Sequence, residues 1–124
     1  MAATFLGYRR SNGQVGVRNL VAILSAMDNT NPTAERISSM VAGTVVLSTP
    51  FGRGQIGDDF NVTLKTLAGI ANHPNIAAVL VLSLSLKSGE YLAGEIAKTG
   101  KPVEVLGLQE GGSAVTMTAE GVRI

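Results

Sequence analysis

The stretch Ala77-Ala78-Val79-Leu80-Val81-Leu82 is continuously apolar and contains several branched side chains. A run of this kind is typical of a strand that is covered on both faces, as in a parallel sheet between helices. Three other runs have the same character: Leu20–Leu24, Thr44–Leu47 and Val103–Leu108. The sequence therefore predicts four buried strands.

Helical signals lie between these runs. Asn31 is predicted as an N-cap with Pro32 at the first helical position, where its missing N–H has no intrahelical partner to lose. Asp58 or Asp59 is predicted to cap a second helix that ends before Pro74. A third helix is predicted to run from near Ser88 to a C-cap at Gly100, and a fourth to begin at Ser113.

The buried faces follow from helical spacing. The positions expected to face the core are Ala34, Ile37 and Val41 in the first helix, Phe60, Leu64, Leu67 and Ala71 in the second, and Tyr91, Leu92 and Ile96 in the third. Strands and helices alternate throughout. This order predicts a single three-layer α/β domain over residues 1–124, with a parallel, Rossmann-like sheet of about four strands flanked by helices.

Composition excludes several classes of function. The 124 residues contain no cysteine, which excludes disulfides, thiolate metal sites and cysteine nucleophiles, and a single histidine excludes a histidine-cluster metal site. The net charge of +1 argues against binding to nucleic acid or an anionic membrane. No run approaches the ~20 apolar residues of a membrane span, and the N-terminus lacks a signal-peptide pattern. We therefore expect a cytoplasmic protein.

Polar and glycine-rich segments follow each predicted strand, and in an open parallel sheet ligands bind at that edge. After the second strand, the Gly52-Arg53-Gly54-Gln55 segment either lets the backbone approach an anion or makes a tight connection to the next helix. After the fourth, Glu110 is either an acid or base, or a solvated residue near a helix start. His73 is interpreted as a turn residue at the opposite edge.

A segment before the first strand carries further candidates. Asn12-Gly13 suits a turn with positive φ. Arg18 either clamps a carboxylate or phosphate or pairs with a group of the protein itself.

Several blocks together resemble the altronate/galactarate dehydratase family. Gly7-Tyr8 followed by Gly13-Gln14-Val15-Gly16-Val17-Arg18-Asn19 matches the form GYxRxDGRxGVRN, and Thr66 to Ala77 is similar to "TLAGLARHPNVAG". Thr99-Gly100-Lys101-Pro102-Val103-Glu104 and Gln109-Glu110-Gly111-Gly112 resemble "TGKPVE…QEAGG". The resemblance spans essentially the whole chain in collinear order.

The resemblance implies a hydro-lyase that removes water from sugar acids such as altronate or galactarate, with a divalent metal such as iron; a related branch acts on sulfolactate. It also implies a larger C-terminal region that this chain lacks. We therefore expect a domain or small subunit of a sugar-acid dehydratase system, not catalytic alone, with a larger dehydratase subunit as a partner. The alternative is a non-catalytic module that binds a small carboxylate, sulfonate or phosphate. Self-association into a homo-oligomer is a further expectation.

The chain departs from the family at its cysteines. The family's "GCxN", "GCGQ" and "GLGCE" correspond here to a segment with Asn29 and Asn31, to Gly52–Gln55, and to Ser83-Leu84-Ser85-Leu86-Lys87. Arg53 and Lys87 would add positive charge there, so we expect repulsion of a divalent cation, attraction of an acidic ligand, and no metal or cofactor held by this chain. The catalytic residues are left open between Glu110 and Lys87, and a new site built on these two and Arg53 is a further alternative. The expected ligand-binding residues are Arg18, Asn29, Asn31, Gly52, Arg53, Gly54, Gln55, Gln109, Gly111 and Gly112.

Overall fold

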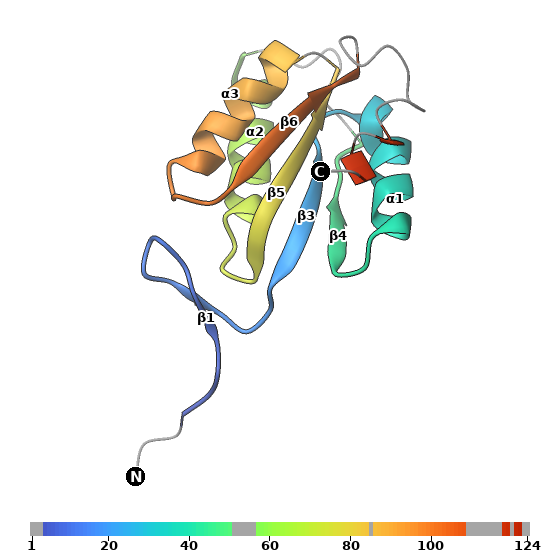
Figure 1. Cartoon of the computed structure of the whole chain (residues 1–124). Helices are drawn as coiled ribbons and strands as arrows, with labels where there is room; N and C mark the ends of the chain where they lie inside the picture. The colour runs from blue at the N-terminus through green and yellow to red at the C-terminus, as the bar shows by residue number, and fades with distance from the viewer. Residues whose placement is uncertain (1–3, 51–56, 85, 109–117, 120, 123–124) are drawn as a thin grey trace.

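The structure is a computed structural model that describes residues 4–50, 57–84, 86–108, 118–119 and 121–122. Its centre is a four-stranded parallel sheet in the order β4-β3-β5-β6 (Figure 1). The strands are β3 (Leu20–Ser25), β4 (Thr44–Leu47), β5 (Ile76–Ser83) and β6 (Val103–Gly107). All four predicted strands are confirmed, with ends that differ by one residue or none.

Helices cover both faces of the sheet. They are α1 (Asn31–Met40), α2 (Gly57–Ala71) and α3 (Leu86–Ala97), and a short 3₁₀ turn, η1 (Asp28–Thr30), precedes α1. Figure 1 shows α2 and α3 on one side of the sheet and α1 on the other. The three-layer α/β fold is therefore confirmed. Within the described ranges, no helix has the length and apolarity needed to cross a membrane.

The continuous apolar runs follow from this layering. In β5, Val79 and Val81 belong to the core beneath α2 and α3, whereas Leu80 and Leu82 belong to the core beneath α1. Successive side chains of a strand point to opposite faces, and here both faces are buried. A strand between two helical layers therefore lacks the alternation of apolar and polar residues that is typical of a strand with one face in solvent.

Some expected details of the helices are wrong. Asn31 does not cap α1, because the η1 turn moves the N-cap to Thr30 and makes Asn31 the first helical residue. Asp58 and Asp59 lie in the first turn of α2, after Gly57, and do not cap it. Tyr91 is 61% exposed, because Leu92 and Ile96, four residues apart, define the buried side of α3.

Other details are confirmed. Ala34, Ile37, Leu64, Leu67 and Ala71 are buried. Phe60 and Val41 are half-buried, and Val41 is the C-cap of α1. Gly100 has the expected left-handed conformation, with a φ of 83°, and its N–H donates to the Ala97 carbonyl at 2.9 Å; because α3 ends at Ala97, Gly100 lies in the turn after the helix and not at its C-cap. Of the expected fourth helix, residues 113–117 lie outside the described residues, and 118–119 and 121–122 are helical.

An antiparallel hairpin precedes the sheet at the amino ends of its strands (Figure 1). It pairs β1 (Tyr8–Arg9) with β2 (Val15–Gly16). Gly13 has a φ of 87° in the connecting turn, and its N–H donates to the Arg10 carbonyl at 2.9 Å. The predicted Asn12-Gly13 turn is confirmed.

Candidate functional site

The strand order reverses between β3 and β5, which are neighbours in the sheet. After β3 the chain passes through α1 to β4 on one side, and after β5 it passes through α3 to β6 on the other. The two connections diverge at the carboxyl ends of these strands, which is the topological switch point where open α/β sheets bind ligands. Asn29 and Asn31 follow β3 there, and Lys87 lies in the first turn of α3, just after β5.

Two buried hydroxyls form the base of this edge. Ser25 Oγ and Thr30 Oγ1 are 2.6 Å apart, and the Met27 carbonyl oxygen lies 2.7 Å from the first and 2.9 Å from the second. One hydroxyl can therefore donate to the other, which donates to the carbonyl. The Ala26 N–H donates to the Leu82 carbonyl at 2.9 Å. These bonds fix the segment after β3 to the end of β5.

Two amide oxygens at this edge are buried without a partner. The Nδ2 of Asn31 donates to the Thr49 carbonyl oxygen at 2.9 Å. A carbonyl can only accept, so this bond fixes the orientation of the Asn31 amide. Its Oδ1, like the Oδ1 of Asn29, is buried and has no hydrogen-bond partner among the described residues. Leaving a buried acceptor unsatisfied costs about 1–3 kcal/mol, which a ligand with hydroxyl donors would recover.

The helices supply positive potential at the same edge. The N-termini of α1 and α3 both begin here, and the exposed Lys87 lies in the first turn of α3. Backbone N–H groups and the helix dipole favour an anion at such an end. The edge thus combines acceptors suited to hydroxyl groups with two helix N-termini and Lys87 that favour an anion, next to the carboxylate of Asp28 in η1.

Among the other predicted site residues that the structure describes, Arg18 does not join this group. Arg18 precedes β3 at the amino edge of the sheet, where its N–H donates to Asn75 Oδ1 at 3.2 Å and its carbonyl accepts from Arg10 Nη2 at 2.8 Å. His73 lies in the turn before β5, as predicted, and its Nδ1 accepts from the Asn75 N–H at 3.1 Å. The remaining predicted residues lie outside the described residues: Gly52, Arg53, Gly54, Gln55, Gln109, Glu110, Gly111 and Gly112.

The described donor set at the carboxyl edge does not fit an iron ion. Protein iron sites use imidazole, thiolate and carboxylate ligands. Here the unpartnered oxygens are neutral amides and a lysine lies on the adjacent helix. Asp28 in η1 adds a carboxylate, but no group of three or more His, Asp or Glu residues occurs within the described ranges.

Lys101 is a residue that the sequence alone does not single out. It is only 9% exposed, and its Nζ donates to the carbonyl oxygens of Ala71 at 2.9 Å and His73 at 3.0 Å. Burial, together with the nearby charge of Arg10, lowers the pKa of Lys101 below its ordinary value of 10.5. In the sequence, a lysine just after a helix is only a weak indication of a buried, functional lysine, because most lysine side chains remain in solvent.

Arg10 fixes the hairpin to the body of the protein. Its Nε donates to the Pro74 carbonyl at 2.6 Å, and its Nη1 donates to Asn19 Oδ1 at 3.0 Å. Its guanidinium also lies 5.5 Å from the centre of the Tyr8 ring. Asn75 Oδ1 accepts from the Val17 N–H at 2.9 Å. Two blocks that carry the family resemblance, one before β3 and one before β5, therefore bind each other.

Together, the fold and the switch-point site define a parallel α/β domain that presents a ligand-binding edge at the carboxyl ends of β3 and β5. The chain belongs to the family described as "D-galactarate dehydratase/Altronate hydrolase, second domain", whose model matches residues 7–124. The resemblance found in the sequence is thus confirmed.

Individual relatives agree with this family. The chain is 40% identical over 114 residues to the (2R)-sulfolactate sulfo-lyase subunit beta of Chromohalobacter salexigens. This match covers 92% of the chain and 29% of the relative. It is 34% identical to the altronate dehydratases of Bacillus subtilis, over 97 residues, and Escherichia coli, over 96 residues. These two matches cover 70% and 69% of this chain and 20% and 19% of the relatives. No solved structure gives a significant match. The chain therefore spans less than a third of each of these relatives.

Proposed function

We propose that this chain supplies the hydroxy-acid-binding part of a lyase, and that residues outside the chain complete the reaction. The names of its relatives describe loss of water from altronate and loss of a sulfo group from sulfolactate. Both molecules are 2-hydroxy carboxylates. The proposed substrate class is therefore a 2-hydroxy acid with a leaving group on the next carbon.

One observation carries this proposal: the pair of buried, unpartnered oxygens of Asn29 and Asn31 at the switch point. These oxygens accept hydrogen bonds, so they suit the hydroxyl groups of such an acid. The dipole of α1 favours its carboxylate, although the Asn31 N–H donates to the Asp28 carbonyl and Pro32 has no N–H to offer. In this arrangement the chain binds and orients the substrate.

The elimination needs further groups. A base must remove the proton on the carbon next to the carboxylate, and the leaving group must be assisted by an acid or a metal. The described residues at this edge offer the carboxylate of Asp28 and the exposed ammonium group of Lys87, but no histidine. We assign the base, and any metal, to residues outside the described part, in a larger partner subunit or region like those of the longer relatives.

A pair of matched ligands tests the binding role. (2R)-Sulfolactate and 3-sulfopropanoate differ only by the 2-hydroxyl group, and calorimetry or amide chemical shifts measure their affinities for the full chain. We expect sulfolactate to bind more tightly by about tenfold, the equivalent of one hydrogen bond of ~1.4 kcal/mol. Asn29→Ala is expected to remove most of that preference.

Asn61→Ala provides the matched control, because Asn61 is an exposed asparagine on α2. Equal affinity for the two ligands, unchanged by Asn29→Ala, would contradict hydroxyl recognition and favour a module that binds anions only. Altronate mixed with the chain alone is expected to give no dehydrated product, with the Bacillus subtilis altronate dehydratase as the positive control.

A further inference from the structure

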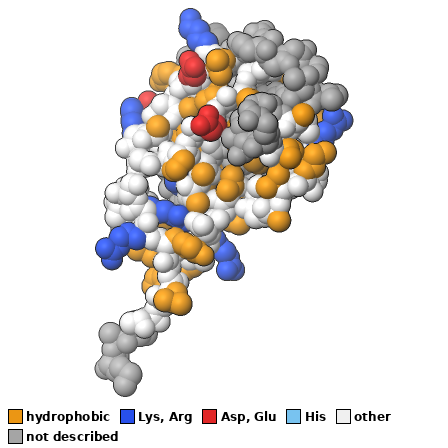
Figure 2. Space-filling model, in the orientation of Figure 1, with side chains coloured by type: hydrophobic (Ala, Val, Ile, Leu, Met, Phe, Trp, Pro, Cys, Tyr) orange, Lys and Arg blue, Asp and Glu red, His pale blue; other side chains and the backbone are white. Residues whose placement is uncertain are grey.

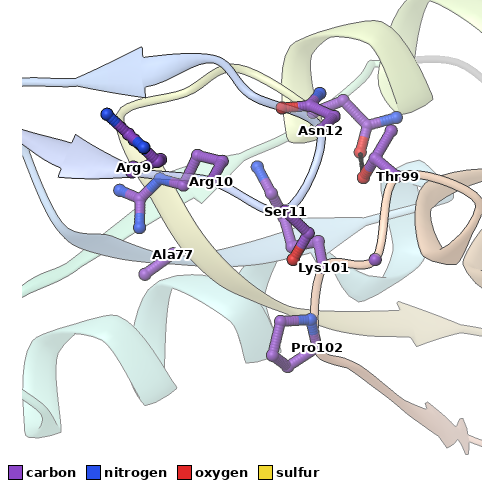
Figure 3. Close-up of a pocket in the computed structure, with 10 residues that line it drawn as sticks. Arg9, Arg10, Ser11, Asn12, Ala77, Thr99, Lys101 and Pro102 are labelled. Atoms are coloured by element: carbon purple, nitrogen blue, oxygen red, sulfur yellow. Dashed lines mark hydrogen bonds between the residues drawn. The ribbon is translucent and has the colours of Figure 1, made fainter.

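A second cavity lies at the opposite, amino edge of the sheet. It has a volume of about 140 Å³ and lies between the hairpin and the turn that leads into β6. Figure 3 shows Arg9 and Arg10 on one side of it and Thr99 on the other, with Lys101 and Pro102 between them. Its walls come from distant parts of the sequence, so only the folded chain creates it.

The cavity concentrates positive charge. Arg9, Arg10 and Lys101 all line it, whereas none of its lining residues is acidic. Figure 2 shows Lys and Arg side chains gathered around the base of the hairpin. Like charges held close together at a partly buried site repel each other, and an anion between them would remove that cost.

Several donors in this cavity remain available. An ammonium group has three N–H donors, and Lys101 uses two of them on the carbonyls of Ala71 and His73. Arg10 uses three of its five donors, on Pro74, Asn19 and Arg18. The guanidinium group of Arg9 has no hydrogen-bond partner within the described ranges. Carbonyl oxygens position Lys101 and Arg10, but no carboxylate among the lining residues neutralises them.

Packing fixes the shape of the cavity. A Cβ added to Gly100 would lie 2.8 Å from the Cβ of Ser11, so the hairpin tip rests directly against this turn. Thr99 Oγ1 donates at 3.1 Å to Asn72 Oδ1, which closes another wall (Figure 3). The Arg10 guanidinium and the Lys101 ammonium group are therefore fixed beside this space by their hydrogen bonds, whereas the exposed Arg9 lines it from the rim.

We propose that this cavity is a binding site for a small oxyanion, either a phosphate or the carboxylate of a small organic acid, separate from the carboxyl-edge site. Planar guanidinium groups match two oxygens of such an ion, and the buried Lys101 supplies a third donor. The volume of about 140 Å³ suits one small anionic group. Because the site lies at the amino edge of the sheet, it is independent of the proposed hydroxy-acid site.

Titration of the ¹⁵N-labelled full chain with inorganic phosphate, and separately with citrate, tests this proposal at constant ionic strength set with chloride. We expect saturable amide shifts confined to residues 9–12 and 99–101 for at least one of the two anions. A response to phosphate alone identifies the phosphate source, and a response to citrate alone identifies the carboxylate source.

Arg9→Gln and Lys101→Met are each expected to weaken the anion about tenfold, the loss of one charge-assisted contact. Arg9 is exposed, so its variant is expected to fold even where Lys101→Met does not. Lys65→Met removes one charge from an exposed position on α2 and is expected to leave affinity unchanged.

Three outcomes would overturn the proposal: no saturable shift with either anion, shifts centred on residues 28–31 in place of the hairpin, or equal loss of affinity in Arg9→Gln and Lys65→Met. The third would show only a general attraction to positive charge. Failure of this test leaves the sulfolactate comparison unaffected, because that comparison reports on Asn29.

Discussion

Single residues hold the hairpin against the sheet. Gly16 lies where β2 passes the turn before β5, and a Cβ added there would overlap the carbonyl group of Pro74. Arg10 bonds the same carbonyl oxygen through its Nε at 2.6 Å. The absence of a side chain at Gly16 is thus what lets Arg10 reach its partner. The glycine at position 16 of the family motif is therefore explained by the close approach of its backbone to that of Pro74, and not by a reactive group.

Gly16→Ala is expected to destabilise the protein by about 1–3 kcal/mol, because backbone atoms of Pro74 and Asn75 must move away. Gly69→Ala, on the exposed side of α2 with open space around it, is the matched control. That control is expected to stabilise by about 0.5–1 kcal/mol through helix propensity. Chemical denaturation measures both values, and equal stability of the two variants would contradict the close approach.

Lys101 gives the stability a dependence on pH. Its pKa is lowered in the folded state, so between that value and 10.5 the unfolded chain binds more protons than the folded chain. The free energy of unfolding therefore increases as the pH rises through that window, which means that this residue stabilises the folded protein more at the higher pH. Relative to Lys101→Met, the unmodified protein is expected to become more stable in thermal melts as the pH rises toward 10.5. A constant difference across that range would contradict the shift.

At the level of elements, α3 shows how two identical residues take different roles. Gly89 and Gly94 both lie within this helix. A Cβ at Gly89 would lie 2.6 Å from Cγ1 of Val105 and 3.1 Å from the Cβ of Ser83, whereas nothing lies within 4 Å at Gly94. The first glycine lets α3 pack closely on β5 and β6, and the second faces open space.

The two substitutions to alanine are expected to have opposite signs. Gly89→Ala should destabilise, because overpacking costs about 1–3 kcal/mol and exceeds the gain in helix propensity. Gly94→Ala should stabilise by about 0.5–1 kcal/mol. Urea denaturation of both variants measures the signs, and a stabilised Gly89→Ala would show that the helix does not pack as closely as the distances indicate.

At the level of the whole molecule, the two edges of one sheet carry different chemistry. The carboxyl edge presents the buried acceptors of Asn29 and Asn31, and the amino edge presents the cations of the hairpin cavity. The central strands β3 and β5 run from the amino edge to the carboxyl edge, and each of them is hydrogen-bonded to a neighbouring strand on both sides. Among the described strands, β1 and β2 pair with each other and not with the central sheet, and most of their residues are exposed.

Hydrogen exchange is expected to follow this arrangement. Amides of β3 and β5 should exchange most slowly, since opening them requires disruption of the whole sheet. Amides of β1 and β2 should exchange fastest among the strands, by local detachment. Exchange followed by NMR or mass spectrometry checks the order. Protection of the hairpin equal to that of β5 would show that it unfolds only with the sheet.

Much of the fold is determined by the sequence alone. Continuous apolar runs such as Ala77–Leu82 specify strands buried on both faces, and Gly13 and Gly100 take the positive φ that their turns require. The relevant physics is local, because periodicity and backbone conformation depend on a few neighbouring residues. Family membership likewise follows from blocks readable along the chain.

The tertiary structure determined the contacts between residues that are far apart in the sequence, which local sequence patterns do not specify. Arg10 meets Pro74 across 64 positions, and Lys101 meets Ala71 across 30. The unpartnered oxygen of Asn31 is likewise defined only once its Nδ2 bonds Thr49. Arg18 joins the amino edge, away from Asn29, because the hairpin folds back on the turn before β5. Hydrogen-bond partners, burial and charge depend on which distant segments meet, so the sequence indicates which residues are candidates and packing determines what each one touches.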